Sequence, residues 1–81
     1  MNLKTIRNLP NMHLFMDACA DALQNGAHLR TQEREGQWLF NTLLEAYEKL
    51  AEKLRGTEYD PFYVDDRIPK FWEFVRIHWN D

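Results

Sequence analysis

The residues best suited to metal chemistry stand on one predicted helix near the N-terminus. His13, Asp17 and Asp21 follow one another at intervals of four residues, so they share one helix face. Metal sites on helices use imidazole and carboxylate groups at such a spacing. No second helix offers an obvious further ligand, because His28 and His78 lie elsewhere in the chain. We therefore interpret the row as a solvated helix face and predict no metal site.

Nucleophilic catalysis has few candidate residues in this sequence. Cys19 is the single cysteine, and it falls on the apolar side of the same predicted helix, where a thiol is usually a small core residue. The chain contains no serine, which removes every scheme with a serine nucleophile. The three glycines stand singly at positions 26, 36 and 56, so there is no glycine-rich phosphate loop. We predict that the protein is not an enzyme and that it uses no cofactor.

Carboxylates gather shortly before the C-terminal segment. Four of them fall within nine positions: Glu58, Asp60, Asp65 and Asp66. They lack the spacing and the closing glutamate of a helix-loop-helix calcium site. Such a group can bind a basic partner or imitate the phosphates of a nucleic acid, and it is also what an ordinary solvated loop contains.

Aromatic residues gather in the same part of the chain. Seven occur in 21 positions: Tyr59, Phe62, Tyr63, Phe71, Trp72, Phe74 and Trp79. On a helix that starts at Pro69, Trp72 and Trp79 share one face, and Phe71 and Phe74 share another. A small domain usually covers only one such face, so we expect the second to form an exposed contact patch. The alternative is a last helix wedged between two neighbours, with both faces in the core.

A long amphipathic helix in the middle of the chain must organise these residues. Its apolar positions recur at spacings of 3, 4, 3 and 4: Phe40, Leu43, Tyr47, Leu50 and Leu54. Its opposite side is charged and should face water: Glu45, Glu48, Lys49, Glu52 and Lys53. We predict one helix over residues 32–55, with Thr31 as its N-cap and Gly36 as the place where a bend is possible; the alternative is a helix that breaks at Gly36.

Two further helices complete the expected fold. The first runs over residues 10–25, is capped by Asn8 or Asn11, and stops at Asn25 and Gly26. The last runs over residues 69–79. The sequence therefore predicts a single all-α domain over residues 1–81. It is a small bundle of three main helices, with an N-terminal arm at residues 1–9 and an ordered aromatic loop before the last helix.

The charge and composition of the chain narrow the classes of partner and compartment. The net charge is -3, and 13 acidic and 10 basic residues are interspersed without a basic stripe, so we do not expect direct contact with nucleic acid. One cysteine excludes an internal disulfide and fits a reducing compartment. The N-terminus lacks the apolar run of a signal peptide, and no 18-residue apolar segment exists. We expect a cytoplasmic protein that does not enter a membrane.

One short stretch resembles a known family. The segment IPKFWEFVR, residues 68–76, is similar to the closing segment of the Hha/YmoA family, small helical proteins that modulate a nucleoid-associated silencing protein. The resemblance covers only this segment and needs a one-residue gap. It implies no more than a small helical modulator that acts through another protein.

Together these observations favour a noncatalytic binding module that inhibits or regulates a larger protein, as small inhibitors from phages or mobile elements do by analogy. We expect the contact surface to be the aromatic and acidic C-terminal segment: Tyr59, Asp60, Phe62, Tyr63, Asp65, Asp66, Lys70, Trp72, Arg76 and Trp79. One alternative is a self-associating helical protein, a homodimer closed by the central stripe or by the aromatic face. The other is a small helical transcription or nucleoid regulator.

Overall fold

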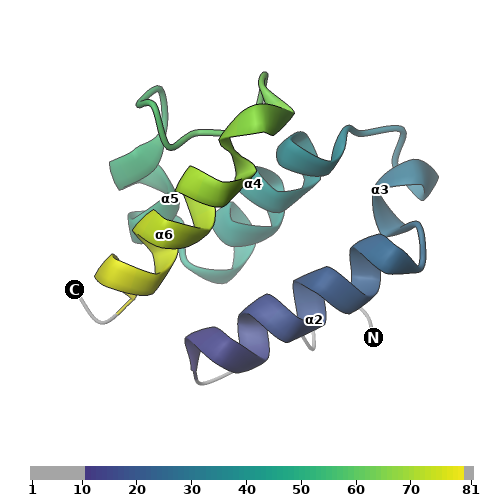
Figure 1. The fold of residues 1–81 in the computed structure, drawn as a ribbon, viewed down its shortest axis with the longest axis horizontal. Coiled ribbons are helices and arrows are strands. Elements are labelled where there is room, and N and C mark those ends of the chain that lie inside the picture. Colours follow the sequence, from purple (N-terminus) through teal and green to yellow (C-terminus); the bar gives the residue numbers. More distant parts are fainter. Residues whose placement is uncertain (1–10, 80–81) are drawn as a thin grey trace.

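Helices make up most of the chain between residues 11 and 79, the part that the computed structural model describes. In chain order they are α2 (Met12–Gln24), α3 (Ala27–Arg30), α4 (Glu35–Ala46), α5 (Glu48–Leu54) and α6 (Ile68–His78), with a 3-10 turn, η1 (Asp65–Arg67), directly before α6 (Figure 1). The predicted small all-α bundle is confirmed. The predicted N-terminal arm lies outside the described residues.

Helix α2 follows the capping and stop signals of its sequence. The side chain of Asn11 accepts a hydrogen bond from the Leu14 amide at 2.9 Å and so caps the helix, whose first helical residue is Met12. The helix ends at Gln24, and Gly26 then adopts a left-handed φ of 79°, which a glycine accepts without strain. The inward face packs against the rest of the bundle through its buried residues: Met12, Phe15, Ala18, Cys19 and Ala22.

The prediction of one unbroken central helix is wrong, because the helix is interrupted at Tyr47. This residue has φ -143° and ψ 81°, and it serves both as the C-cap of α4 and as the N-cap of α5. The burial pattern survives the break: Phe40, Leu43, Leu50 and Leu54 are buried, and Tyr47 is half-buried. The charged residues predicted to face water are all exposed. The apolar stripe therefore indicates the inward surface correctly, although two shorter helices carry it.

The predicted start of the central helix is also wrong. Residues 27–30 form the short helix α3, and α4 begins at Glu35 with Arg34 rather than Thr31 as its N-cap. Gln32 has φ 60°, a left-handed conformation that cannot continue a helix. Gly36 lies within the first turn of α4, which continues past it to Ala46.

The core forms where α2, α4, α5 and α6 meet. Its largest fully enclosed side chains include Phe15 from α2, Leu39 and Leu43 from α4, Leu54 from α5 and Phe71 from α6. Helix α6 contacts both α2 and α5. In Figure 1 it lies in front of α4 and α5, with α2 below it in the view. None of the helices between residues 11 and 79 has the length and apolar character required to cross a membrane.

Candidate partner-binding surface

Trp72 of α6 and Trp79, the C-cap of α6, both pack inward. The ring centroid of Trp79 lies 4.3 Å from that of Tyr47 and 5.4 Å from that of Phe15. The centroid of Trp72 lies 6.1 Å from that of Phe15. Both tryptophans are half-buried. Their contacts follow the alternative in which the last helix is wedged between its neighbours, because α6 meets α2 and α5 at once.

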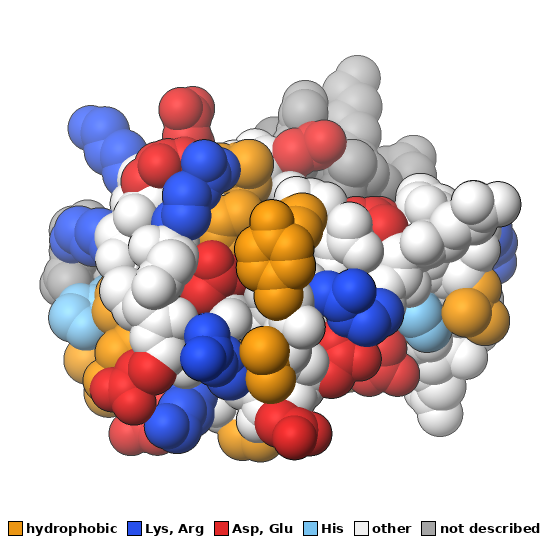
Figure 2. All heavy atoms as spheres, turned by 90° about the horizontal axis from the view of Figure 1, so that it is seen from above, with side chains coloured by type: hydrophobic (Ala, Val, Ile, Leu, Met, Phe, Trp, Pro, Cys, Tyr) orange, Lys and Arg blue, Asp and Glu red, His pale blue; other side chains and the backbone are white. Residues whose placement is uncertain are grey.

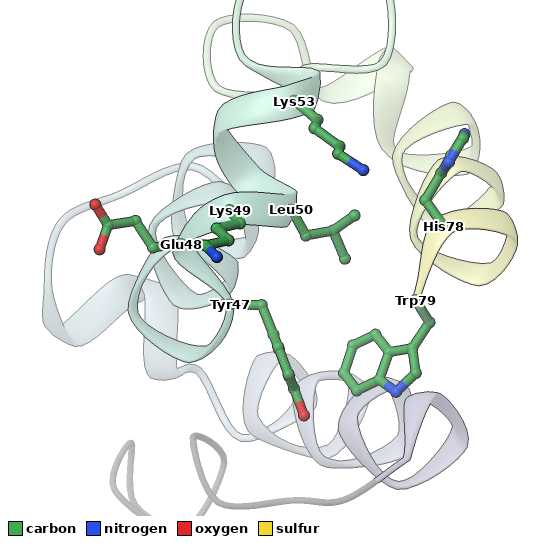
Figure 3. A pocket seen from close by; sticks show the side chains of 7 residues that line it. All are labelled: Tyr47, Glu48, Lys49, Leu50, Lys53, His78 and Trp79. Carbon is green, nitrogen blue, oxygen red and sulfur yellow. The ribbon is translucent and has the colours of Figure 1, made fainter. Parts of the chain in front are cut away.

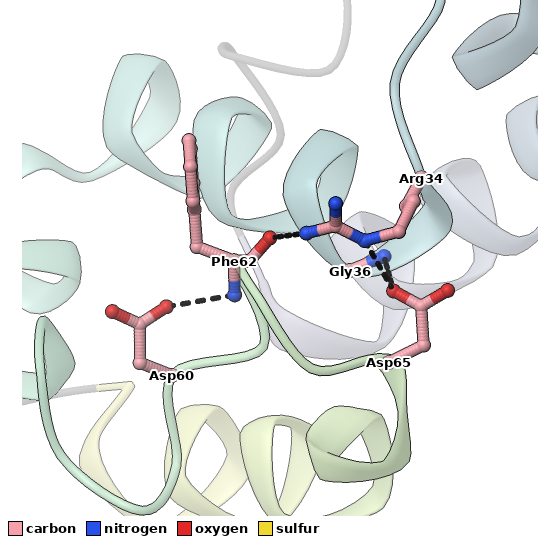
Figure 4. A network of polar contacts seen from close by, with 5 residues as sticks. All are labelled: Arg34, Gly36, Asp60, Phe62 and Asp65. Atoms are coloured by element: carbon pink, nitrogen blue, oxygen red, sulfur yellow. Dashed lines mark hydrogen bonds and ion pairs between the residues drawn. The ribbon is translucent and has the colours of Figure 1, made fainter.

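Asp60 is a buried residue that shapes the loop before η1. One of its carboxylate oxygens accepts a hydrogen bond from the Gly56 amide at 2.8 Å, and the other accepts from the Phe62 amide at 2.9 Å (Figure 4). Aspartate commonly closes turns in this way, by bonding to a backbone amide two residues ahead. The side chain therefore determines the path of residues 56–62, and both of its oxygens are already engaged.

Asp65 connects the loop to the first turn of α4. Its Oδ1 atom accepts a hydrogen bond from the Gly36 amide at 3.1 Å and lies 3.6 Å from Nε of Arg34. Arg34 also donates a hydrogen bond to the carbonyl oxygen of Phe62, so one guanidinium contacts the loop at two places (Figure 4). The loop is thus held to a helix that lies far earlier in the sequence.

Most of the other predicted contact residues lie around this loop or on the outer side of α6. Tyr59 is half-buried, with its ring centroid 5.2 Å from that of Phe74. Lys70 forms an ion pair with Glu58 at 3.1 Å; both side chains are more than half exposed, and such pairs add little stability. Asp66 and Arg76 are exposed.

The loop presents one large side chain fully to solvent. Tyr63 is 81% exposed, and Val64 beside it is 39% exposed. Phe62 is half-buried; its ring packs edge-on against Phe40 of α4 at 5.8 Å and against Tyr63 at 4.7 Å between centroids. Figure 2 views the molecule from the side on which this loop lies, with hydrophobic side chains standing among charged ones. We call residues 57–64 the aromatic loop.

A hollow of about 260 Å³ lies beside Tyr63 and is called the loop hollow: Phe40, Asn41, Leu44, Arg55, Asp60, Phe62 and Tyr63 line it. The guanidinium of Arg55 sits over the Phe40 ring at 5.4 Å from its centroid and pairs with Glu52 at 3.1 Å. The contribution of α4 and Arg55 was not predicted from the sequence. No spacing pattern links these positions to residue 63, because only the return of the chain over α4 brings them together.

A second hollow, of about 390 Å³, lies between α5 and the end of α6. Tyr47, Leu50 and Trp79 form its apolar wall, and Lys53 and His78 stand on opposite sides of it (Figure 3). Its tyrosine and tryptophan belong to the ring contacts that pack α6 against the bundle. This hollow therefore borders the core, and none of the residues that line it is a fully exposed aromatic side chain.

Cys19 is buried, and burial raises the pKa of its thiol to about 12. The thiolate is the reactive form, and at pH 8 it would amount to roughly one part in ten thousand. We expect no reaction with a disulfide reagent in native buffer at pH 8, and one equivalent of reaction in denaturant. The extent of reaction is measured by the absorbance of the thiol that the reagent releases. Rapid labelling of the native protein would contradict the buried position of Cys19.

The candidate metal row lies on the outside of α2. His13, Asp17 and Asp21 are exposed, and within residues 11–79 no three histidine, cysteine or acidic side chains come together in a group that could hold a metal ion. The polar side chains that hold the aromatic loop are Arg34 and Asp65, which pair with each other, and Asp60, which bonds to the Phe62 amide. Neither protein-family models, characterised proteins nor solved structures give a match to this chain, so its function is inferred from its own geometry.

Proposed function

We propose that this protein is a noncatalytic module that binds a larger protein, and so inhibits or regulates it, through the aromatic loop and the loop hollow. The observation that carries the proposal is the position of Tyr63, which is 81% exposed on a loop whose backbone is held by hydrogen bonds. An unconstrained exposed aromatic residue could fold back onto the domain. Here the backbone presents the ring outward.

Preorganisation favours binding through this loop. A held loop loses little conformational entropy when a partner binds, so more of the contact energy appears as affinity. Tyrosine is among the residues that most often dominate interface energetics, because it combines a large apolar ring with a polar hydroxyl. The loop hollow beside Tyr63 offers space for a partner side chain against Phe40 and Leu44, with the guanidinium of Arg55 at its wall.

The proposed surface contains fewer central residues than the contact surface predicted from the sequence. We place its centre on Phe62, Tyr63 and Val64, which share the exposed end of the aromatic loop. Trp72 and Trp79 contribute to packing on Phe15, and Asp60 has both carboxylate oxygens engaged. The remaining predicted contact residues, Asp66 and Arg76 among them, would belong to the polar rim.

Affinity capture tests the proposal. We expect tagged protein to retain a stoichiometric partner from nuclease-treated lysate of its source or host, and we expect Tyr63→Ala to lose it. The thermal midpoint should shift little, because the Tyr63 side chain is mostly in water. Leu29→Ala is the matched control, since Leu29 is an apolar side chain with 70% exposure on α3. Equal retention by Tyr63→Ala and the control would contradict the proposed surface.

Self-association is the competing result at the same surface. In a two-fold interface, the exposed Tyr63 ring of each copy could fill the loop hollow of the other copy. Analytical sedimentation from micromolar concentrations upward separates the two cases. If the wild type is a dimer and Tyr63→Ala is a monomer, the partner at this surface is a second copy of this chain. If the wild type is a strict monomer, the surface is free for another partner.

A further inference from the structure

The start of α4 and the aromatic loop meet across a long sequence distance. The Arg34 guanidinium donates to the carbonyl oxygen of Phe62, 28 residues away. The Gly36 amide donates to Asp65, 29 residues away, at 3.1 Å. The two contacts begin at neighbouring positions, the N-cap and the first turn of α4, and they end at different residues, Phe62 and Asp65, so the segment is held at two points (Figure 4).

The loop can pack against α4 in this way only because residue 36 is a glycine. A Cβ atom built there would clash with the carbonyl oxygen of Pro61 and would lie 2.9 Å from Oδ1 of Asp65. Gly36 is buried within the first turn of α4. The absence of a side chain therefore lets the loop backbone rest directly on the helix backbone, and it brings the aspartate within hydrogen-bond distance of the amide.

The same contacts complete the helix. The first amides of an α-helix have no partner within the helix, and a negative charge near them is favourable. The local N-cap residue, Arg34, provides no side-chain cap. Asp65 supplies an acceptor to Gly36 from outside the helix. Helix start and loop thus stabilise one another, and loss of the aspartate should loosen both.

We propose that Arg34, Gly36 and Asp65 form a clamp that holds the aromatic loop in its binding conformation. These three are then positioning residues: they act on the partner through the placement of Tyr63. The effect on partner binding rests on the proposed function, whereas the effect on loop order does not. The clamp can therefore be tested in the protein alone.

Backbone order parameters from NMR relaxation provide that test. In the wild type we expect residues 61–64 to give values near about 0.85, as rigid backbone does, and in Asp65→Ala values below about 0.6. Asp66→Ala is the matched control, because it removes the same charge from the neighbouring exposed position in η1. A flexible wild-type loop, or equal values in the two variants, would overturn the clamp.

A conservative variant covers the case in which Asp65→Ala does not fold. Arg34→Lys keeps the positive charge but loses the planar fork that reaches both Phe62 and Asp65. We expect the same loss of loop order. If the released loop spends a tenth of its time in the bound conformation, the Kd for the captured partner rises about tenfold. Full loop order in Arg34→Lys would overturn the role of Arg34.

The two proposals fail in different ways. If loop order falls in Arg34→Lys and Asp65→Ala but Tyr63→Ala keeps the partner, the clamp stands and the proposed binding surface fails. If Tyr63→Ala loses the partner while loop order is unchanged in the clamp variants, the surface stands and the clamp fails.

Discussion

Phe15→Ala should lower the free energy of unfolding by about 3–5 kcal/mol, the usual cost of removing a buried phenylalanine ring. Phe15 has no exposed surface, and its ring lies within 6.3 Å of Tyr47, 6.1 Å of Trp72 and 5.4 Å of Trp79 between centroids. Removing the ring would leave a cavity and would abolish the contacts by which α2 packs against Tyr47, Trp72 and Trp79. A domain of 81 residues has a total stability of about 4–12 kcal/mol, so the loss would be a large part of it.

Urea denaturation followed by tryptophan fluorescence and by circular dichroism measures this loss. Leu14→Ala is the matched control, because Leu14 is the neighbouring residue on α2 and is 45% exposed. We expect the control to change stability by no more than about 1 kcal/mol. A midpoint for Phe15→Ala that equals that of the control would show that Phe15 is not central to the core.

Gly36→Ala should destabilise the protein by about 1–3 kcal/mol, the range for overpacking a tightly packed site. On helix propensity alone the sign would be opposite, since alanine in a helix is favoured over glycine by about 1 kcal/mol. The added methyl would clash with the carbonyl oxygen of Pro61, so the loop or the helix start must move. The same urea denaturation reports the sign of the change.

Gly56→Ala is the control for this prediction. Gly56 has φ 76°, and apart from its chain neighbours no atom lies within 4 Å of the position that a Cβ would occupy. Alanine there therefore costs only backbone strain, about 1–2 kcal/mol. Both variants lose stability, but the NMR signals of residues 61–64 should change more in Gly36→Ala, because only at that position does the added methyl meet the loop backbone. A gain in stability for Gly36→Ala would disprove the close approach of the loop to α4.

The helical class of this protein follows from its sequence alone, because hydrophobic periodicity directly reports which side of a helix is buried. The central stripe, the exposed charged side, the Asn11 cap and the stop at Gly26 all depend on neighbours within a few positions, and all agree with the structure. Features of this kind can be predicted without the fold, because they depend only on residues of the same helix.

The break at Tyr47 depends instead on tertiary contacts. No glycine or proline lies between residues 37 and 55, so the sequence contains no local reason to interrupt the helix. The ring of Tyr47 packs 4.3 Å from Trp79 and 6.3 Å from Phe15 between centroids, and these contacts compensate for the lost helical continuity. Phe15 belongs to α2 and Trp79 follows directly on α6, and periodicity within one helix contains no information about either.

The sequence predicts an ordered aromatic loop before the last helix, but which of its side chains face solvent depends on distant residues. Composition indicates that residues 58–66 are rich in aromatic and acidic side chains. Only the folded chain distinguishes Asp60, which holds the backbone, from Tyr63, which faces solvent. Gly36 shows the reason most clearly. In sequence it looks like a weak point in a helix, and in the fold its missing side chain makes room for a loop that arrives 25 residues later, at Pro61.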